Sequence, residues 1–197
     1  EFFHEWKRLK ESDAGSVELE TMLRGICEKK TFLDLLENFI LYDHSGGRTT
    51  KILARNHQYL GVNEAVSAYE NRKLKDGRLG VFWHTQGSGK SYSMVFLAQK
   101  IRRKFAGSPT IVVLTDRDEL NRQISDTFEN CGLLGKTKAS QFIASSGTDL
   151  VKKLQGNPSF VFALIQKFNL PKEPPIYPDH DILILSDEAH RSQYGIF

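Results

Sequence analysis

The chain contains 197 residues and carries a net charge of +3 at pH 7, with 40% hydrophobic and 26% charged residues. This length suffices for one domain with a real hydrophobic core and an appended helical piece, and the composition is typical of a folded globular protein. No apolar stretch approaches the length of a membrane span and no signal peptide is visible, so we expect a cytoplasmic protein without a membrane partner. The first residue is Glu1 rather than methionine, so we expect a fragment of a longer chain.

The cysteines and the net charge indicate which kinds of site and partner this chain can have. Cys27 and Cys131 are isolated, with no metal-ligand spacing around them, which argues against a disulfide framework and a zinc cluster. The small positive charge is compatible with nucleic-acid binding but supports it only weakly.

Residues 1–42 are predicted to be helical. The apolar residues of one stretch follow the i, i+3, i+4, i+7, i+8 spacing of a helix face: Phe32, Leu35, Leu36, Phe39 and Ile40. Residues 43–47 read Asp-His-Ser-Gly-Gly and predict a turn or linker. We therefore expect a helical N-terminal segment over residues 1–47 and a larger domain over residues 48–197.

The larger region predicts alternating helices and strands. A helical pattern runs from Ile52 to Lys75. The short apolar runs beyond it suit parallel strands covered on both faces: Leu79–Trp83, Thr110–Leu114, Phe160–Ile165 and Asp181–Leu185. Helical patterns separate them: Ser91–Phe105, Asp118–Cys131 and Thr148–Gln155. The order predicts an α/β fold with a mostly parallel sheet flanked by helices. Four prolines between residues 171 and 178 predict a stiff, extended connection before the last strand.

A glycine-rich turn joins the first predicted strand to the following helix. Backbone N–H groups in such a turn, together with the start of the helix, bind phosphate. Lys90 would reach the β- and γ-phosphates, and the Ser91 hydroxyl would ligate Mg²⁺. We therefore predict a nucleoside-triphosphate site at Thr85, Gln86, Gly87, Ser88, Gly89, Lys90 and Ser91. The general pattern has a glycine where this chain has His84, so the alternative is a flexible turn of chance composition.

The helix after the turn has one apolar face and a basic end. Met94, Ala98, Ile101 and Phe105 fall on one side of the predicted helix. The cations near its end suit the helix dipole and are predicted to form a solvated helix end: Lys100, Arg102, Arg103 and Lys104.

Two adjacent acids follow the last predicted strand. Hydrolysis of a phosphoanhydride needs one carboxylate to hold Mg²⁺ and another to orient or deprotonate water. We predict that Asp187 has the first role and Glu188 the second. The alternative is a helix N-cap. Because open parallel sheets bind ligands at the carboxyl ends of their strands, we expect Lys90, Asp187 and Glu188 to surround one triphosphate–magnesium pocket.

These motifs resemble the first RecA-like motor domain of superfamily-two helicases and translocases. More narrowly, they resemble the motor (R) subunit of type I restriction–modification enzymes. Residues 83–91 (WHTQGSGKS) are similar to its phosphate loop, His84 included, and residues 187–195 (DEAHRSQYG) to its DEAH segment. Residues 115–120 (TDRDEL) resemble motif Ia, and residues 165–168 (IQKF) resemble the next strand end of the family.

The resemblance implies further site residues. Residues 55–59 (RNHQY) resemble the segment that places a glutamine against adenine, which implies nucleotide contacts for Arg55 and Gln58. Arg117 and Lys167 are the candidates for contacts to the DNA backbone. The alternative for both cations is an exposed salt bridge.

The function that the resemblance implies is ATP-driven translocation of double-stranded DNA, with Mg²⁺ as cofactor and the methyltransferase and specificity subunits as partners. The family's nuclease domain and second RecA-like lobe have no counterpart in this sequence. Without the arginine finger of the second lobe, we expect slow ATP turnover. Two alternatives are a non-catalytic nucleotide-binding or docking module and a DEAH-type helicase unconnected with restriction.

Overall fold

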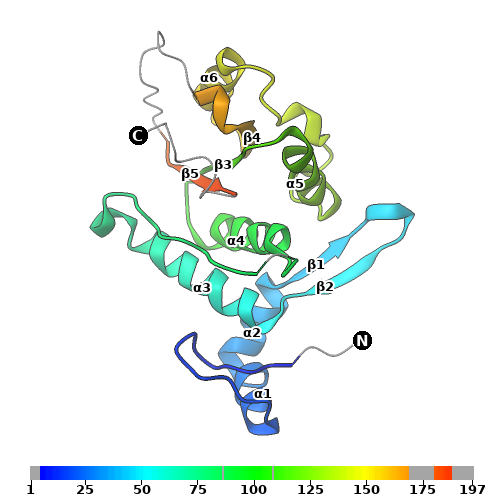
Figure 1. Ribbon diagram of the computed structural model, residues 1–197, viewed down its shortest axis with the longest axis vertical. Helices are drawn as coiled ribbons and strands as arrows, with labels where there is room; N and C mark the ends of the chain where they lie inside the picture. Colours follow the sequence, from blue (N-terminus) through cyan, green and yellow to red (C-terminus); the bar gives the residue numbers. More distant parts are fainter. Residues whose placement is uncertain (1–4, 86, 108, 169–179, 188–197) are drawn as a thin grey trace. The chain divides into compact units, whose positions relative to one another are not determined.

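The computed structural model describes residues 5–85, 87–107, 109–168 and 180–187 (Figure 1). The chain divides into two compact units, Glu1–Ile101 and Arg102–Phe197, and the boundary falls within helix α4 (Lys90–Lys104). In the part of the chain described, no helix is both long and apolar enough to cross a membrane. The predicted proline-rich connection lies outside the described residues.

Within its described residues, the first unit contains three α-helices and the first part of a fourth. These are α1 (Leu19–Ile26), α2 (Lys29–Asn38), α3 (Asn56–Glu70) and the first part of α4. Helix α2 begins where the Glu28 carboxylate accepts a hydrogen bond from the Thr31 N–H, an N-cap that satisfies a free donor of the first turn. Phe39 is fully buried between Tyr59 and Phe96, with ring centroids 4.8 and 5.6 Å away. Within the predicted helical N-terminal segment, helices therefore lie at residues 19–26 and 29–38.

The prediction of helix through residue 42 is wrong at both ends of the segment. Residues 5–18 contain no helix, and Ile40–Asp43 is a strand, β1, paired antiparallel with β2 (Thr50–Leu53). The connection contains Gly46 and Gly47 at φ 65° and 75°, which other residues rarely adopt. This turn lets the backbone of β1 bond across to β2 instead of continuing the helix.

The predicted strand at Leu79–Trp83 is also wrong. Residues 78–85 contain no helix or strand, and Val81 and Trp83 are 85% and 83% exposed. A strand needs a neighbour for its backbone hydrogen bonds, and none pairs with this run within the described residues. Instead, Phe82 packs over α3 at Gly61, where a Cβ would lie only 2.4 Å from the ring.

The second unit contains a parallel three-stranded sheet in the order β4-β3-β5 (Figure 1). The strands are β3 (Thr110–Thr115), β4 (Phe160–Leu164) and β5 (Ile182–Ser186). Every residue of the central strand β3 is buried. The α/β fold class and these predicted strands are confirmed.

Helices cover both faces of this sheet. On one face, Phe128 of α5 (Asp118–Asn130) packs edge-on against Phe160 and Phe162 of β4, with centroids 5.5 and 5.3 Å away. On the other face, Leu150 and Leu154 of α6 (Gly147–Gln155) join a buried cluster with residues of β3 and β4. Burial on both faces explains why the sequences of β3 and β4 are nearly continuously apolar. Short 3₁₀ turns complete the fold at Ser45–Gly47, Arg72–Lys75, Ala139–Gln141 and Ile165–Phe168.

The basic end of α4 departs from its prediction at Lys100. This side chain is buried, and its amine donates to both carboxylate oxygens of Asp34 in α2 (2.5 and 2.6 Å) and to Asn63 Oδ1 in α3 (2.6 Å). The amine also lies 4.9 Å from the centre of the Phe39 ring. Lys100 was predicted to be solvated, but it is a buried cation that joins three helices.

Candidate nucleotide site

The predicted phosphate-binding residues belong to the segment that we call the glycine loop (residues 84–91), which runs into the start of α4. Gly87 and Gly89 have φ angles of 76° and 87°, in the left-handed region that glycine adopts without strain. The Ser88 N–H donates to the Thr85 carbonyl at 3.2 Å, which closes a turn. Gln86 lies outside the described residues. The loop therefore has the curled backbone that its sequence predicts.

Lys90 is the first residue of α4, so the loop leads directly into a helix N-terminus. Its amine donates to the His84 carbonyl at 3.2 Å, and within the described residues it makes no ion pair. Phosphate oxygens are stronger acceptors for a cation than a neutral carbonyl. The Lys90 amine is thus close to the loop and could exchange this bond for a phosphate.

The first turn of α3 contacts the loop. His57 Nε2 donates to the Ser88 carbonyl at 3.2 Å, and Gln58 Nε2 donates to the Gly89 carbonyl at 3.0 Å. Gln58 Nε2 also lies 3.3 Å from Ser93 Oγ. A Cβ at Gly89 would lie 3.0 Å from Gln58 Nε2, so glycine permits this approach. The helix therefore holds two successive carbonyl groups of the loop.

Gln58 is placed beside the loop but is already engaged at both ends of its amide. Its Oε1 accepts from the Arg55 N–H at 2.9 Å, and the residue is only 4% exposed. Arg55, the residue before α3, is exposed. Sequence analysis assigned an adenine contact to Gln58 and a nucleotide contact to Arg55. In this structure, the described bonds of Gln58 fasten α3 to the glycine loop.

A test of fit for a phosphate ligand comes from Ser88. Its hydroxyl oxygen is buried and has no hydrogen-bond partner within the described part of the chain. Buried hydroxyls are usually bonded, so an unpartnered one in this loop fits a polar ligand. Ser91, the predicted Mg²⁺ ligand, lies half-buried in the first turn of α4.

No group of three metal-ligating side chains occurs in the ranges that the structure describes. This agrees with Mg²⁺ chemistry in nucleotide sites, where one or two protein oxygens, phosphates and waters complete the coordination. The predicted Mg²⁺ ligands Ser91 and Asp187 belong to different units, so their shared role stays a prediction.

His84 lies against the same helix turn. Its ring is 4.7 Å from the His57 ring and 4.4 Å from the Phe82 ring. Burial, followed by the nearby His57, lowers the pKa of His84 below its ordinary value; Glu11 opposes this shift and Lys90 adds to it. Since the ordinary value is 6.5, His84 is neutral at pH 7.

In the second unit, polar residues gather where the parallel strands end. The Asp187 N–H donates to the Leu114 carbonyl at 2.8 Å, and Gln166 Nε2 donates to the Asp116 carbonyl at 3.2 Å. The ends of β3, β4 and β5 therefore meet at one edge, as expected of parallel strands. Glu188 lies outside the described residues, and Asp187 and Lys90 belong to different units. The pocket predicted around Lys90, Asp187 and Glu188 stays a prediction.

The two DNA candidates differ in their surroundings. Arg117 is largely exposed, and its Nε lies 3.6 Å from Asp116 Oδ2. Lys167 is half-buried, and its amine donates to the Ala144 carbonyl at 2.5 Å. Arg117 is thus the more accessible of the two cations.

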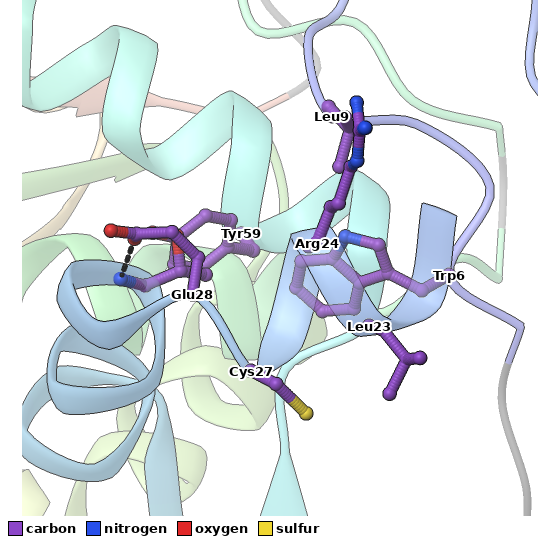
Figure 2. A pocket seen from close by; sticks show the side chains of 9 residues that line it. Trp6, Leu9, Leu23, Arg24, Cys27, Glu28 and Tyr59 are labelled. Carbon is purple, nitrogen blue, oxygen red and sulfur yellow. Dashed lines mark hydrogen bonds between the residues drawn. The ribbon is translucent and has the colours of Figure 1, made fainter. Parts of the chain in front are cut away.

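A cavity of about 590 Å³ lies elsewhere in the first unit, among Trp6, α1, the start of α2 and Tyr59 (Figure 2). In Figure 2 the Trp6 ring and Leu23 lie on one side of the cavity, and Glu28 and Tyr59 lie on the other. None of its lining residues belongs to the glycine loop. The cavity is therefore separate from the candidate nucleotide site.

His57 is the loop contact that sequence analysis did not single out. The only signal was its place beside Gln58 in the segment RNHQY. Its contact with Ser88, 31 residues away, becomes visible only in the folded chain.

Comparisons with known proteins identify relatives of nearly the whole sequence. The family model described as SWI2/SNF2 ATPase matches residues 57–197. The type I restriction enzyme HindI endonuclease subunit of Haemophilus influenzae is 38% identical over 98% of this chain and 20% of its own length. A Methanocaldococcus jannaschii protein, provisionally assigned as the type I restriction enzyme MjaIXP endonuclease subunit, is 35% identical over 90% of this chain and 17% of its own length. The chain thus spans about a fifth of these relatives, and the resemblance to type I restriction subunits is confirmed.

Proposed function

Because this chain belongs to the SWI2/SNF2 ATPase family, we propose that it is the ATP-binding motor part of a type I restriction endonuclease subunit and translocates double-stranded DNA. The observation that carries this proposal is the glycine loop, which leads into α4 with Lys90 as the first helical residue. The Ser88 hydroxyl, which has no hydrogen-bond partner among the described residues, supports a polar ligand there. Relatives named as type I restriction enzyme endonuclease subunits support the restriction context.

Each predicted residue has a role in this proposal. The loop N–H groups and the Lys90 amine bind the β- and γ-phosphates. Ser91 and Asp187 hold Mg²⁺, which neutralises charge on the phosphates when it is bound. Glu188 orients the attacking water and accepts its proton. Thr85 and Gln86 complete the loop.

Recognition of the base is assigned to Gln58, and Arg55 is proposed to contact the nucleotide. The Gln58 amide nitrogen is occupied by the glycine loop, whereas Oε1 accepts a single described bond, from the Arg55 N–H. A carbonyl oxygen has two lone pairs. An adenine amino group would donate to the second lone pair of Oε1, so base recognition and loop contact could share one side chain.

The remaining assignments follow the same proposal. Arg117, and Lys167 after release from Ala144, would contact DNA phosphates without reading sequence. The partners would be the methyltransferase and specificity subunits of a cytoplasmic restriction–modification complex. Residues 1–47, which contain α1 and α2, would precede a motor domain over residues 48–197.

The decisive experiment compares two variants of the intact protein. Lys90→Ala is expected to lose binding of Mg²⁺–ATP, and Glu188→Gln is expected to keep binding but lose ATP hydrolysis and DNA translocation. Binding is measured by calorimetry and translocation by displacement of a triplex-forming strand from duplex DNA. If Glu188→Gln leaves every activity unchanged, the chain is a docking module and the proposal is wrong.

A further inference from the structure

Peptide geometry links the contacts of α3 to the direction of the loop's N–H groups. In a trans peptide, the carbonyl of one residue and the N–H of the next point in opposite directions. His57 holds the Ser88 carbonyl, and Gln58 holds the Gly89 carbonyl. The N–H groups of Gly89 and Lys90 must therefore point away from α3. In the site proposed above, phosphate oxygens would accept hydrogen bonds from these two N–H groups.

We propose that His57 is a positioning residue for nucleotide binding, because it fixes the Ser88–Gly89 peptide plane. This inference rests on the proposed function of the glycine loop. Within the described residues, no other donor bonds the Ser88 carbonyl. This peptide is followed by Gly89, whose φ is 87°. Glycine has many accessible backbone conformations, so the residue itself does not restrict the orientation of the peptide. A loop built on glycine needs such an external hydrogen bond to keep one orientation.

His57 is well placed for this role because its own position is fixed. It lies in the first turn of α3, which the Arg55–Gln58 bond closes at 2.9 Å. Its ring packs 4.7 Å from the ring of His84, whose carbonyl accepts the Lys90 amine. The His57 side chain therefore contacts His84 at the start of the glycine loop and Ser88 within it.

The bond and the ring packing can be separated by two substitutions. His57→Phe keeps an aromatic ring beside His84 but removes the donor at Nε2. His57→Gln removes the ring but supplies an amide N–H at a similar distance from the backbone. If the bond orients the loop, the phenylalanine variant is impaired and the glutamine variant is not.

The test is calorimetric titration of the intact protein with Mg²⁺ and the slowly hydrolysed analogue ATPγS. For His57→Phe we expect the Kd to rise about tenfold, the loss of one hydrogen bond of roughly 1.4 kcal/mol. For His57→Gln we expect a Kd within about twofold of wild type, since the donor is kept. The exposed His44 in the β1–β2 connection offers the control His44→Phe, which should leave the Kd unchanged.

Other results would overturn the inference. A wild-type Kd for His57→Phe would show that the bond is dispensable, and equal losses in both variants would show that ring packing matters instead. If His57→Phe melts at a much lower temperature, His57→Ala removes the same donor and is judged by the same criterion. Wild-type protein that binds ATPγS and hydrolyses ATP keeps the proposed function even if His57 fails. Wild-type protein that binds no nucleotide overturns both.

Discussion

Two extended stretches of this chain are rich in apolar residues yet have opposite surroundings. Strand β3 has a parallel neighbour on each side and helices over both faces, and all its residues are buried. Residues 78–85 pair with no strand in the described chain, and Val81 and Trp83 remain exposed. An apolar run thus becomes a buried strand only where neighbouring strands bond to its backbone and other elements pack over its side chains.

The two units also differ in what their cores contain. The sheet unit has an apolar core of aliphatic and aromatic side chains around β3 and β4. The first unit includes a buried polar cluster at Lys100, Asp34 and Asn63 beside Phe39. Both tryptophans of the chain, Trp6 and Trp83, lie in the first unit, so tryptophan fluorescence reports on that unit alone. Circular dichroism, which measures the loss of helix and sheet, reports on the unfolding of both units.

The largest effect is expected from Phe128→Ala in the sheet unit. Removing a fully buried ring that packs on Phe160 and Phe162 leaves a cavity and should lower the free energy of unfolding by about 4 kcal/mol. Urea unfolding followed by circular dichroism measures it. Phe128→Leu fills most of the space and should lose less. A loss below about 1 kcal/mol would show that the sheet core tolerates a void.

A slightly smaller effect is expected from Lys100→Met in the first unit. The change leaves the Asp34 carboxylate without its buried cation and should cost about 3 kcal/mol. Tryptophan fluorescence during urea unfolding measures it. The double variant Lys100→Met with Asp34→Leu removes both charges and should recover most of the loss. No recovery would mean that the cluster acts through shape rather than charge.

An intermediate effect is expected from Tyr92→Phe, with a defined pH dependence. The Tyr92 hydroxyl donates to the buried Asp43 carboxylate at 2.5 Å, a bond to a charged group that contributes about 2 kcal/mol. Burial alone would raise the pKa of Asp43, but the bonds from Tyr92 and the Ser45 N–H outweigh it and lower the pKa below 3.8.

The sign of this effect follows from the lowered pKa. The contribution of Asp43 to stability is complete above its unfolded pKa and is lost as the pH falls through the lower folded pKa. The stability difference between wild type and Tyr92→Phe should therefore be constant near pH 7 and shrink below pH 3.8. Fluorescence-detected unfolding at a series of pH values measures this. A difference that grows toward acid would contradict the assignment.

The smallest effect is expected from Trp83→Ala. Because the side chain is 83% exposed, its removal should change the free energy of unfolding of this chain by less than about 0.5 kcal/mol. Trp6 still reports unfolding of the first unit in this variant. A loss comparable to that of Phe128→Ala would mean that residues 78–85 are buried in solution.

The elements that sequence analysis predicted well are those with local signals. Strands β3, β4 and β5 are continuous apolar runs, and α5 repeats its apolar residues at helical spacing. The glycine loop was predicted from residue types that its backbone conformation requires. Such features depend on neighbouring residues and can be inferred without knowledge of the fold.

The features that escaped prediction depend on contacts distant in sequence. Ile40 continues the helical spacing of α2, yet its backbone bonds to β2. Lys100 has the composition of a surface helix end, but Asp34, 66 residues away, provides a buried partner. His57 resembles an ordinary helix residue until its bond to Ser88 is seen. The residues next to these three in the sequence do not indicate such contacts, because each contact depends on a partner that only the folded chain brings near.

Gly61 of α3 provides the space in which Phe82, two residues before the glycine loop, packs. The ring of Phe82 occupies the space that a side chain at this position of α3 would fill. A shift of the extended stretch by one helical turn would bring the ring against Glu64 or Ala65, each of which has a Cβ. The absence of a side chain at Gly61 thereby gives the Phe82 ring its place along α3, although no backbone hydrogen bond joins the two segments within the described residues.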